Sequence, residues 1–214
     1  DQPTLSVTAN NPTFVENSAS YVTIFSAASS VTTASNQNFD RLQFTISNVH
    51  TDDLIKVDGL TSNPNTATST TTTTNSLTLV VTVSGSTTTY TLTKASISDS
   101  IIDSVLTGLQ FRSTSENPSN DASEATRVFK ITDIEDTGAN GDQLSLTPAS
   151  NYQSTVSITA VNDGPTLTFT PSSPSLTFHE GDTVTKNMIT YITNFASSIT
   201  DSDDATMNNV QVSS

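Results

Sequence analysis

The 214-residue sequence has no cysteine and no tryptophan, and it has few basic residues and few glycines. Without cysteine the chain forms no disulfide and offers no thiolate ligand to a metal. Its 7 lysines and arginines face 21 aspartates and glutamates, which gives a formal net charge of -14. A field of that sign repels nucleic acid and anionic lipid, so we expect neither as a partner.

Long apolar segments are absent as well, because every apolar run falls well short of the roughly 18 residues that a membrane-spanning helix needs. We therefore expect no direct membrane insertion. The chain opens within a repeating pattern and without a recognisable signal segment, so we expect it to be a piece of a longer protein. Cysteine-free, acidic, threonine-rich chains are typical of secreted and surface proteins of bacteria, which favours an extracellular location.

Catalytic motifs are lacking too. The two histidines, His50 and His179, lie far apart in the sequence, and neither belongs to a zinc or nucleophile motif. The sequence contains no G-x-S-x-G, no H-E-x-x-H and no glycine-rich phosphate loop. We therefore predict that the protein is not an enzyme, and we assign its paired carboxylates to metal binding before general acid-base chemistry.

What the sequence does contain is alternation of apolar and polar residues, the pattern of half-buried strands. Turn-forming pairs such as Asp58-Gly59 and Asn117-Pro118 separate the alternating segments. Short strands with this spacing indicate an all-β sandwich. The predicted strands are residues 42–49, 77–85, 89–95, 127–134 and 154–161.

One segment breaks the alternation. Apolar residues recur there at four-residue intervals, after the capping candidates Ser98 and Asp99. This spacing predicts one short helix, packed across an open end of the sandwich. The four apolar residues are Ile97, Ile101, Val105 and Leu109.

The segment "TATSTTTTTN" (residues 66–75) is of low complexity. One interpretation is a glycosylated or adhesive surface. A solvated loop or the tip of a long β-hairpin explains the composition more simply, and we favour that interpretation.

The sequence also repeats its own beginning. "DGPTLTFTPSSPSLTFHEG" (residues 163–181) aligns with "DQPTLSVTANNPTFVEN" (residues 1–17), and "NFASSIT" (residues 194–200) aligns with "SAASSVT" (residues 26–32). A tandem array of like units explains the repeat. We predict one complete unit, 1–162, and the N-terminal part of a following unit, 163–214, which is either cut short or split by an inserted domain.

Together these features resemble the cadherin-like repeats of giant bacterial RTX-type surface adhesins, which are secreted by the type I route. Three motifs carry the resemblance: the linker "AVNDGP" (residues 160–165), the segment "LTGLQFRSTSENPSNDASEATRVFKITD" (residues 106–133), and the strand endings "TFVEN" and "LTFHEG". The resemblance covers nearly the whole chain. It implies an Ig/cadherin-like Greek-key β-sandwich with one short helix, followed by an incomplete second sandwich module.

The resemblance also implies a calcium site where the two modules join. Such junctions combine an early glutamate, a late D-x-E, the N-D linker and an early D-x-D of the next module. Ca²⁺ takes about six to eight oxygen ligands, and D-x-E at a strand end places both carboxylates on one face. The expected ligands are Glu16, Asp133, Glu135, Asn162, Asp163, Asp201 and Asp203.

Other acidic residues are open to two interpretations. Asp136, Asn140 and Asp142 could hold a second ion, but a glycine-rich hairpin explains them equally well. On the N-terminal side of the chain, a junction with a preceding module would have only Asp1 and Asp40. We therefore expect a weaker site there.

These observations predict a calcium-binding structural extender of a bacterial surface adhesin, which supports cell adhesion or biofilm formation. Its expected partners are neighbouring modules of the same chain. The alternative is a calcium-dependent module of the same kind of adhesin that binds a host or cell-surface peptide or glycan. Unit 1–162 is longer than the usual repeat of the family, with the excess in residues 57–95, and added loops are common recognition sites.

Overall fold

The computed structural model describes residues 2–32, 37–120, 123–138, 144, 146–162, 166–169 and 196–200. The chain divides into two compact units, Asp1–Val161 and Asn162–Ser214. In its described part the regular elements of the first unit are strands, apart from one α-helix and the 3-10 helix η1 (Ala149–Tyr152). The unit is an all-β, Ig-like sandwich, so the predicted fold class is confirmed.

A seven-stranded sheet forms one layer of the first unit, in the order β2-β13-β12-β5-β10-β9-β8. Neighbouring strands run antiparallel except β2 and β13, which are parallel. Because β12, β5 and β10 are neighbours without being consecutive, the chain crosses between layers, as in Greek-key sandwiches. The strands are β2 (Thr13–Val15), β5 (Phe39–Ser47), β8 (Thr68–Thr72), β9 (Thr78–Ser84), β10 (Thr87–Ile97), β12 (Thr126–Asp136) and β13 (Gln153–Thr159).

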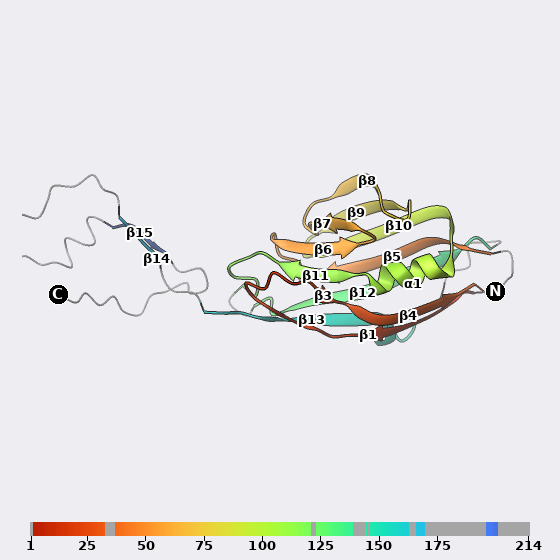
Figure 1. The fold of residues 1–214 in the computed structure, drawn as a ribbon, viewed down its shortest axis with the longest axis horizontal. Helices are drawn as coiled ribbons and strands as arrows, with labels where there is room; N and C mark the ends of the chain where they lie inside the picture. Colours follow the sequence, from red (N-terminus) through yellow and green to blue (C-terminus); the bar gives the residue numbers. More distant parts are fainter. Residues whose placement is uncertain are drawn as a thin grey trace, which may run out of the picture. The chain divides into compact units, whose positions relative to one another are not determined.

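A four-stranded sheet in the order β3-β11-β6-β7 lies against this layer, and β1 and β4 form a separate antiparallel pair. Figure 1 shows β11, β6 and β7 side by side, with β1 and β4 along another margin of the unit. These strands are β1 (Thr4–Ala9), β3 (Val22–Thr23), β4 (Phe25–Val31), β6 (Asp53–Val57), β7 (Leu60–Ser62) and β11 (Gln110–Ser113).

Aromatic side chains from both layers meet in the core. Phe111 of β11 lies edge-on to Phe14 of β2, with ring centroids 5.5 Å apart, and to Phe129 of β12 at 6.2 Å. Phe44 of β5 stacks on Tyr90 of β10 at 4.9 Å. All five rings are at most 1% exposed. Edge-on and stacked aromatic pairs are favourable beyond the apolar area they bury, so this cluster holds the two sheets together.

The five predicted strands are all confirmed, and they correspond in chain order to β5, β9, β10, β12 and β13. The predicted Asp58-Gly59 turn joins β6 to β7, with φ of 42° at Asp58 and 79° at Gly59. Both residues lie in the left-handed region, as a tight two-residue hairpin turn requires. The threonine-rich segment is part of a hairpin, because β8 pairs with β9 and forms the edge of the large sheet.

The predicted helix is α1 (Asp99–Thr107), and Ser98 occupies its N-cap position without a side-chain capping bond. Its buried residues are Ile102, Val105 and Leu106. Figure 1 shows α1 beside β4, and the contact is polar as well as apolar. The main-chain N–H and the hydroxyl of Ser30 both lie 2.8 Å from Oδ1 of Asp103 and donate to it.

Among the described helices none is long and apolar enough to cross a membrane.

In the second unit, β14 (Thr166–Phe169) pairs antiparallel with β15 (Ala196–Thr200). The aligned segments of the first unit form β1 and β4, which also pair antiparallel. Phe169 is opposite Ala196, as the aligned residues Val7 and Ala28 are opposite each other. The two units therefore open with the same strand pair, as a tandem repeat would. That residues 163–214 belong to a like module stays a prediction.

Replacing Phe111 by alanine should lower the free energy of unfolding by about 3 to 5 kcal/mol, because the cavity opens between three packed rings. The control is Val31→Ala on β4, where the side chain is 49% exposed, and the change should stay within about 0.5 kcal/mol. Urea unfolding of both variants measures the difference. Equal losses in the two variants would contradict this account of the core.

Candidate functional site

Glu16 lies where the first unit meets the linker to the second. It follows β2 directly and is only 3% exposed. Its main-chain N–H donates to the carbonyl of Thr159 at 3.0 Å, and its Oε2 accepts the N–H of Val161 at 2.7 Å. The carboxylate therefore holds the start of the linker against the sandwich, one residue before the exposed Asn162.

Asp133 and Glu135 lie together on one face of β12, as their D-x-E spacing predicts. Both carboxylates form ion pairs with Arg41 of β5, Asp133 with Nε and Glu135 with the other end of the guanidinium. Glu135 is directly opposite Arg41 in the strand register. Burial lowers the pKa of Arg41, but the hydrogen bond and charge of Asp133 with the charge of Glu135 outweigh burial and raise it.

The structure does not bring Glu16 together with Asp133 and Glu135, so the predicted shared junction site is wrong in this respect. β2 is parallel to β13, with Val15 opposite Thr159 at the linker. β12 is antiparallel to β13, so its last residues lie at the other end of the sheet. Ten residues of strand correspond to roughly 30 Å, several times the reach of one cation.

Three of the predicted ligands, Asp163, Asp201 and Asp203, lie outside the described residues. Where the structure describes the chain, no group of three or more histidine, aspartate or glutamate side chains converges to hold a metal ion. The calcium site at the junction therefore stays a prediction. Its described members are Glu16, bound to the linker, and Asn162, which follows it.

The sheet end that carries Asp133 and Glu135 also contains a second acidic pair. Asp136, the last residue of β12, is fully buried, and its Oδ1 accepts the N–H of Gly138 at 2.8 Å. Its Oδ2 and the Oδ1 of Asp40 on β5 are both buried, and neither has a hydrogen-bond partner in the described part of the chain. The sequence alone does not relate Asp136 to Asp40, because 95 residues separate them in the chain. Only the structure shows that their strands, β12 and β5, are neighbours.

Burial is the main influence on the Asp40 carboxyl, and it raises the pKa. The adjacent Arg41 lowers the pKa, while the negative charges of Asp136 and Asp133 raise it further. The net shift is upward, so the local environment disfavours the ionised form of Asp40. The guanidinium of Arg41 compensates this carboxylate only in part, because Arg41 also forms ion pairs with Asp133 and Glu135.

A buried ion pair lies at the end of β12 nearer the linker. Arg127 and Asp53 are both fully buried, and Nε lies 2.6 Å from Oδ2. The guanidinium also donates to the carbonyls of Pro118 at 2.7 Å and Glu124 at 2.6 Å. Burial raises the pKa of Asp53, and Arg127 opposes that rise. With its hydrogen bonds satisfied, this pair holds the Asn117-Pro118 turn against β6, a structural role that the sequence pattern did not reveal.

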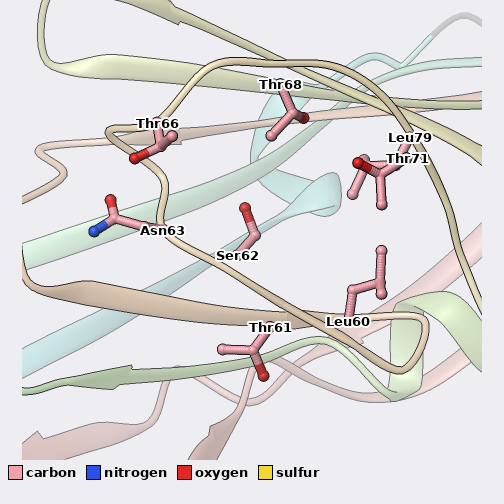
Figure 2. A pocket seen from close by; sticks show the side chains of 8 residues that line it. All are labelled: Leu60, Thr61, Ser62, Asn63, Thr66, Thr68, Thr71 and Leu79. Carbon is pink, nitrogen blue, oxygen red and sulfur yellow. The ribbon is translucent and has the colours of Figure 1, made fainter.

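A hollow of about 240 Å³ lies between the edge strands of the two sheets, β7 and β8. Figure 2 shows Leu60 and Leu79 among hydroxyl-bearing side chains around it. Tyr90, the aromatic residue of the extra segment, is fully buried under Phe44 and bonds to Ser62 at 3.1 Å, so it offers no stacking surface for a sugar. The lining residues are Leu60, Thr61, Ser62, Asn63, Thr66, Thr68, Thr71 and Leu79.

No protein-family model and no curated protein sequence matches the chain. Among solved structures, a non-cellulosomal cohesin from the hyperthermophilic archaeon Archaeoglobus fulgidus is similar, with 10% sequence identity and a TM-score of 0.32. The match covers 75% of this chain and 93% of the cohesin. A likeness this distant carries no argument, so the function is argued from the chain's own residues.

Replacing Arg41 by methionine should lower the free energy of unfolding at pH 7 by about 1 to 2 kcal/mol, because Asp133 and Glu135 lose their shared cation. Salt screens the repulsion between the two uncompensated carboxylates, so the loss should shrink at high ionic strength.

Lys130→Met on the same strand is the matched control, since it also removes one positive charge and no carboxylate is paired with Lys130 in the described part of the chain. Urea unfolding at several salt concentrations compares the two variants. A loss in Arg41→Met that equals the loss in Lys130→Met, or that does not change with salt, would contradict the ion-pair assignment.

Proposed function

We propose that this chain is a structural spacer from a tandem array, an extender module of an RTX-type adhesin on a bacterial cell surface. The observation that carries the proposal is the anchored linker. Glu16 is buried and binds the N–H of Val161, and the second compact unit begins at Asn162. A spacer needs such an anchor, because a freely jointed linker fixes neither the distance between neighbouring modules nor their relative direction.

The repeated strand pair supports the tandem arrangement. In each unit the first strand pairs antiparallel with the strand that contains the aligned "ASS" segment. A chain built from like units of this kind buries each unit's core separately and grows by addition of modules. The proposed partners are therefore neighbouring modules of the same chain, and the proposed role is to support cell adhesion or biofilm formation without catalysis.

Calcium is proposed as the ion that stiffens the joint between the units. The side chains assigned to the joint offer only oxygen donors, which suit a hard cation. Without the cation, clustered carboxylates repel one another and the joint becomes flexible. The D-x-E of β12 has no part in this site because it lies at the other end of the sheet. The proposed ligands are Glu16, Asn162, Asp163, Asp201 and Asp203.

Small-angle X-ray scattering of the 214-residue chain tests this proposal. With calcium the maximum dimension should be longer, and the distance distribution narrower, than with a chelator. Glu16→Gln should reduce that calcium response, because it weakens both the anchor and the proposed ligand set.

The matched control is Glu116→Gln, which changes an exposed glutamate of the first unit and should leave the calcium response intact. Identical scattering of the parent chain with calcium and with chelator would show that calcium does not stiffen the joint.

A second candidate function is recognition of a peptide or glycan, and the hollow between β7 and β8 favours it. The hollow lies within the segment that makes the first unit longer than usual repeats, and its lining is uncharged although the chain carries a net charge of -14. Hydroxyl groups around two leucines can bind a polar ligand that also has an apolar face. Calcium would act here by ordering the module that presents the hollow.

Peptide and glycan arrays in calcium-containing buffer test this second function with one pair of variants. Thr71→Lys changes a residue that lines the hollow, and Thr70→Lys changes the exposed neighbour on the same strand, which does not line it. Binding that Thr71→Lys abolishes and Thr70→Lys preserves would place the ligand in the hollow. Equal binding by both variants would remove this function from the hollow.

A further inference from the structure

The outer face of the four-stranded sheet carries positive charge in a chain that is otherwise strongly acidic. Two of the 7 basic residues lie on it, Lys56 of β6 and Arg112 of β11. Their strand neighbours Ile55 and Phe111 are opposite each other and fully buried. Because successive side chains of a strand point to opposite faces, Lys56 and Arg112 point outward. Lys56 is exposed and Arg112 is half-buried.

Both cations lie against the ring of Tyr21, which precedes β3. The Nζ of Lys56 is 4.1 Å from the ring centroid, and the Cζ of Arg112 is 5.8 Å from it. An aromatic ring attracts a cation that lies over its face within about 6 Å. The Nη1 of Arg112 also donates to the carbonyl of Ala19 at 3.3 Å. The ring therefore holds two positive charges close enough for one ligand to reach both.

Among the described residues, no carboxylate forms an ion pair with either cation. The acidic residues at the start of β6 have other neighbours, because Asp53 is buried with Arg127 and Asp52 lies 4.0 Å from Nδ1 of His50. The chain has three acidic residues for each basic one. Two adjacent cations without a carboxylate are therefore unusual here, and they are free to bind an acidic ligand.

A row of polar side chains crosses the sheet beside these cations. Its four members are opposite one another in successive strand pairs, and none of them is buried. Four neighbouring strands give the row a length of roughly 14 Å. Hydroxyl and amide groups both donate and accept hydrogen bonds. The row consists of Thr23 of β3, Gln110 of β11, Lys56 of β6 and Thr61 of β7.

We propose that this face binds an acidic glycan, a chain of sugars that carry carboxylates. Lys56 and Arg112 donate to the carboxylates, and the polar row exchanges hydrogen bonds with the sugar hydroxyls. This site differs from the uncharged hollow between β7 and β8, although Thr61 borders both. The inference goes beyond the proposed spacer and does not depend on calcium at the junction.

A glycan fits this face better than an acidic peptide does. The main chains of β11 and β6 are paired with a neighbouring strand on both sides. A peptide lying across them would find no partners for its own N–H and C=O groups, which is why peptides add to the open edges of sheets. A glycan has no peptide backbone, and its hydroxyls bind side chains of the kind that the row contains.

The net charge of the chain limits how large and how dense the acidic ligand can be. At physiological ionic strength, exposed charges more than about 8 Å apart are largely screened from one another. A short glycan that touches Lys56 and Arg112 directly is therefore attracted more strongly than the remote carboxylates repel it. Nucleic acid and anionic lipid surfaces extend over the acidic remainder of the chain, so they stay excluded.

Calorimetric titration of the full 214-residue chain with a galacturonate hexamer tests the proposal. The buffer contains physiological salt and a chelator, so that no metal ion bridges two carboxylates. The hexamer should bind, and a neutral galactose hexamer should bind about ten-fold more weakly or not at all. Lys56→Met and Arg112→Met should each weaken binding of the galacturonate hexamer by about ten-fold, because each removes a charge-assisted hydrogen bond.

Lys130→Met is the matched control for the loss of a positive charge. Lys130 alternates with the fully buried Phe129 and Ile131 of β12, so it lies on the outer face of the other sheet, and its loss should leave the affinity unchanged. Tyr21→Phe should also keep the affinity, because the ring that holds both cations remains. Tyr21→Leu should weaken binding by roughly two- to five-fold.

Two further variants separate this site from the functions proposed above. Thr71→Lys changes the hollow between β7 and β8 and should not weaken binding of the galacturonate hexamer. Glu16→Gln changes the anchor of the linker and should bind the hexamer as the parent chain does.

Four results would overturn the proposal. The first is no binding of the galacturonate hexamer in the presence of chelator. The second is an equal loss of affinity in Lys130→Met and Lys56→Met. The third is binding that Thr71→Lys abolishes and Lys56→Met preserves, which places the glycan in the hollow. The fourth is a glutamate hexapeptide that binds as tightly as the galacturonate hexamer. Lys56→Met decides the matter if Arg112→Met or Tyr21→Leu fails to fold, since Lys56 is exposed.

Discussion

The antiparallel pairing of β12 with both β13 and β5 is the constraint on which the first unit depends. β12 contributes Phe129 to the aromatic core, and its first residues bring Arg127 to Asp53 at the end nearer the linker. Because the strand runs away from the linker, Asp133 and Asp136 lie at the opposite end. The direction of β12 therefore decides that Asp133 and Asp136 lie beside β5 and away from the linker.

Because positive charge is scarce, the carboxylates at the two ends of β12 are compensated to different extents. The chain has 7 basic residues for 21 acidic ones, and two of the seven form ion pairs at the two ends of β12: Arg127 from the strand itself and Arg41 from the neighbouring β5. Arg127 is fully buried and its donors are satisfied by the Asp53 carboxylate and three carbonyls, so this ion pair is balanced. Arg41 is shared by two carboxylates, so its positive charge compensates the neighbouring Asp40 only in part.

Local patterns predicted much of the fold. Alternation of apolar and polar residues identified the five interior strands of the large sheet, β13, β12, β5, β10 and β9. The Asp58-Gly59 turn also lies where the dipeptide predicts it. The helix was placed correctly, but its predicted apolar positions were only partly right. Ile97 belongs to β10, and the helix buries Ile102 and Leu106 along with Val105. Contact with β4 decides which helix face is buried, and a spacing rule on one segment does not contain that information.

By itself the sequence determined the residue chemistry and the local geometry of this protein: strands, turns, an internal repeat, and a D-x-E whose two carboxylates share a face of β12. Only the tertiary structure decided what those carboxylates meet. Arg41 is 92 residues away from Asp133, and Glu16 is 145 residues away from the linker nitrogen that it binds. Strand direction and register are set by pairing and core packing across the whole unit, so they separate Glu16 from the D-x-E and bring the D-x-E to Arg41.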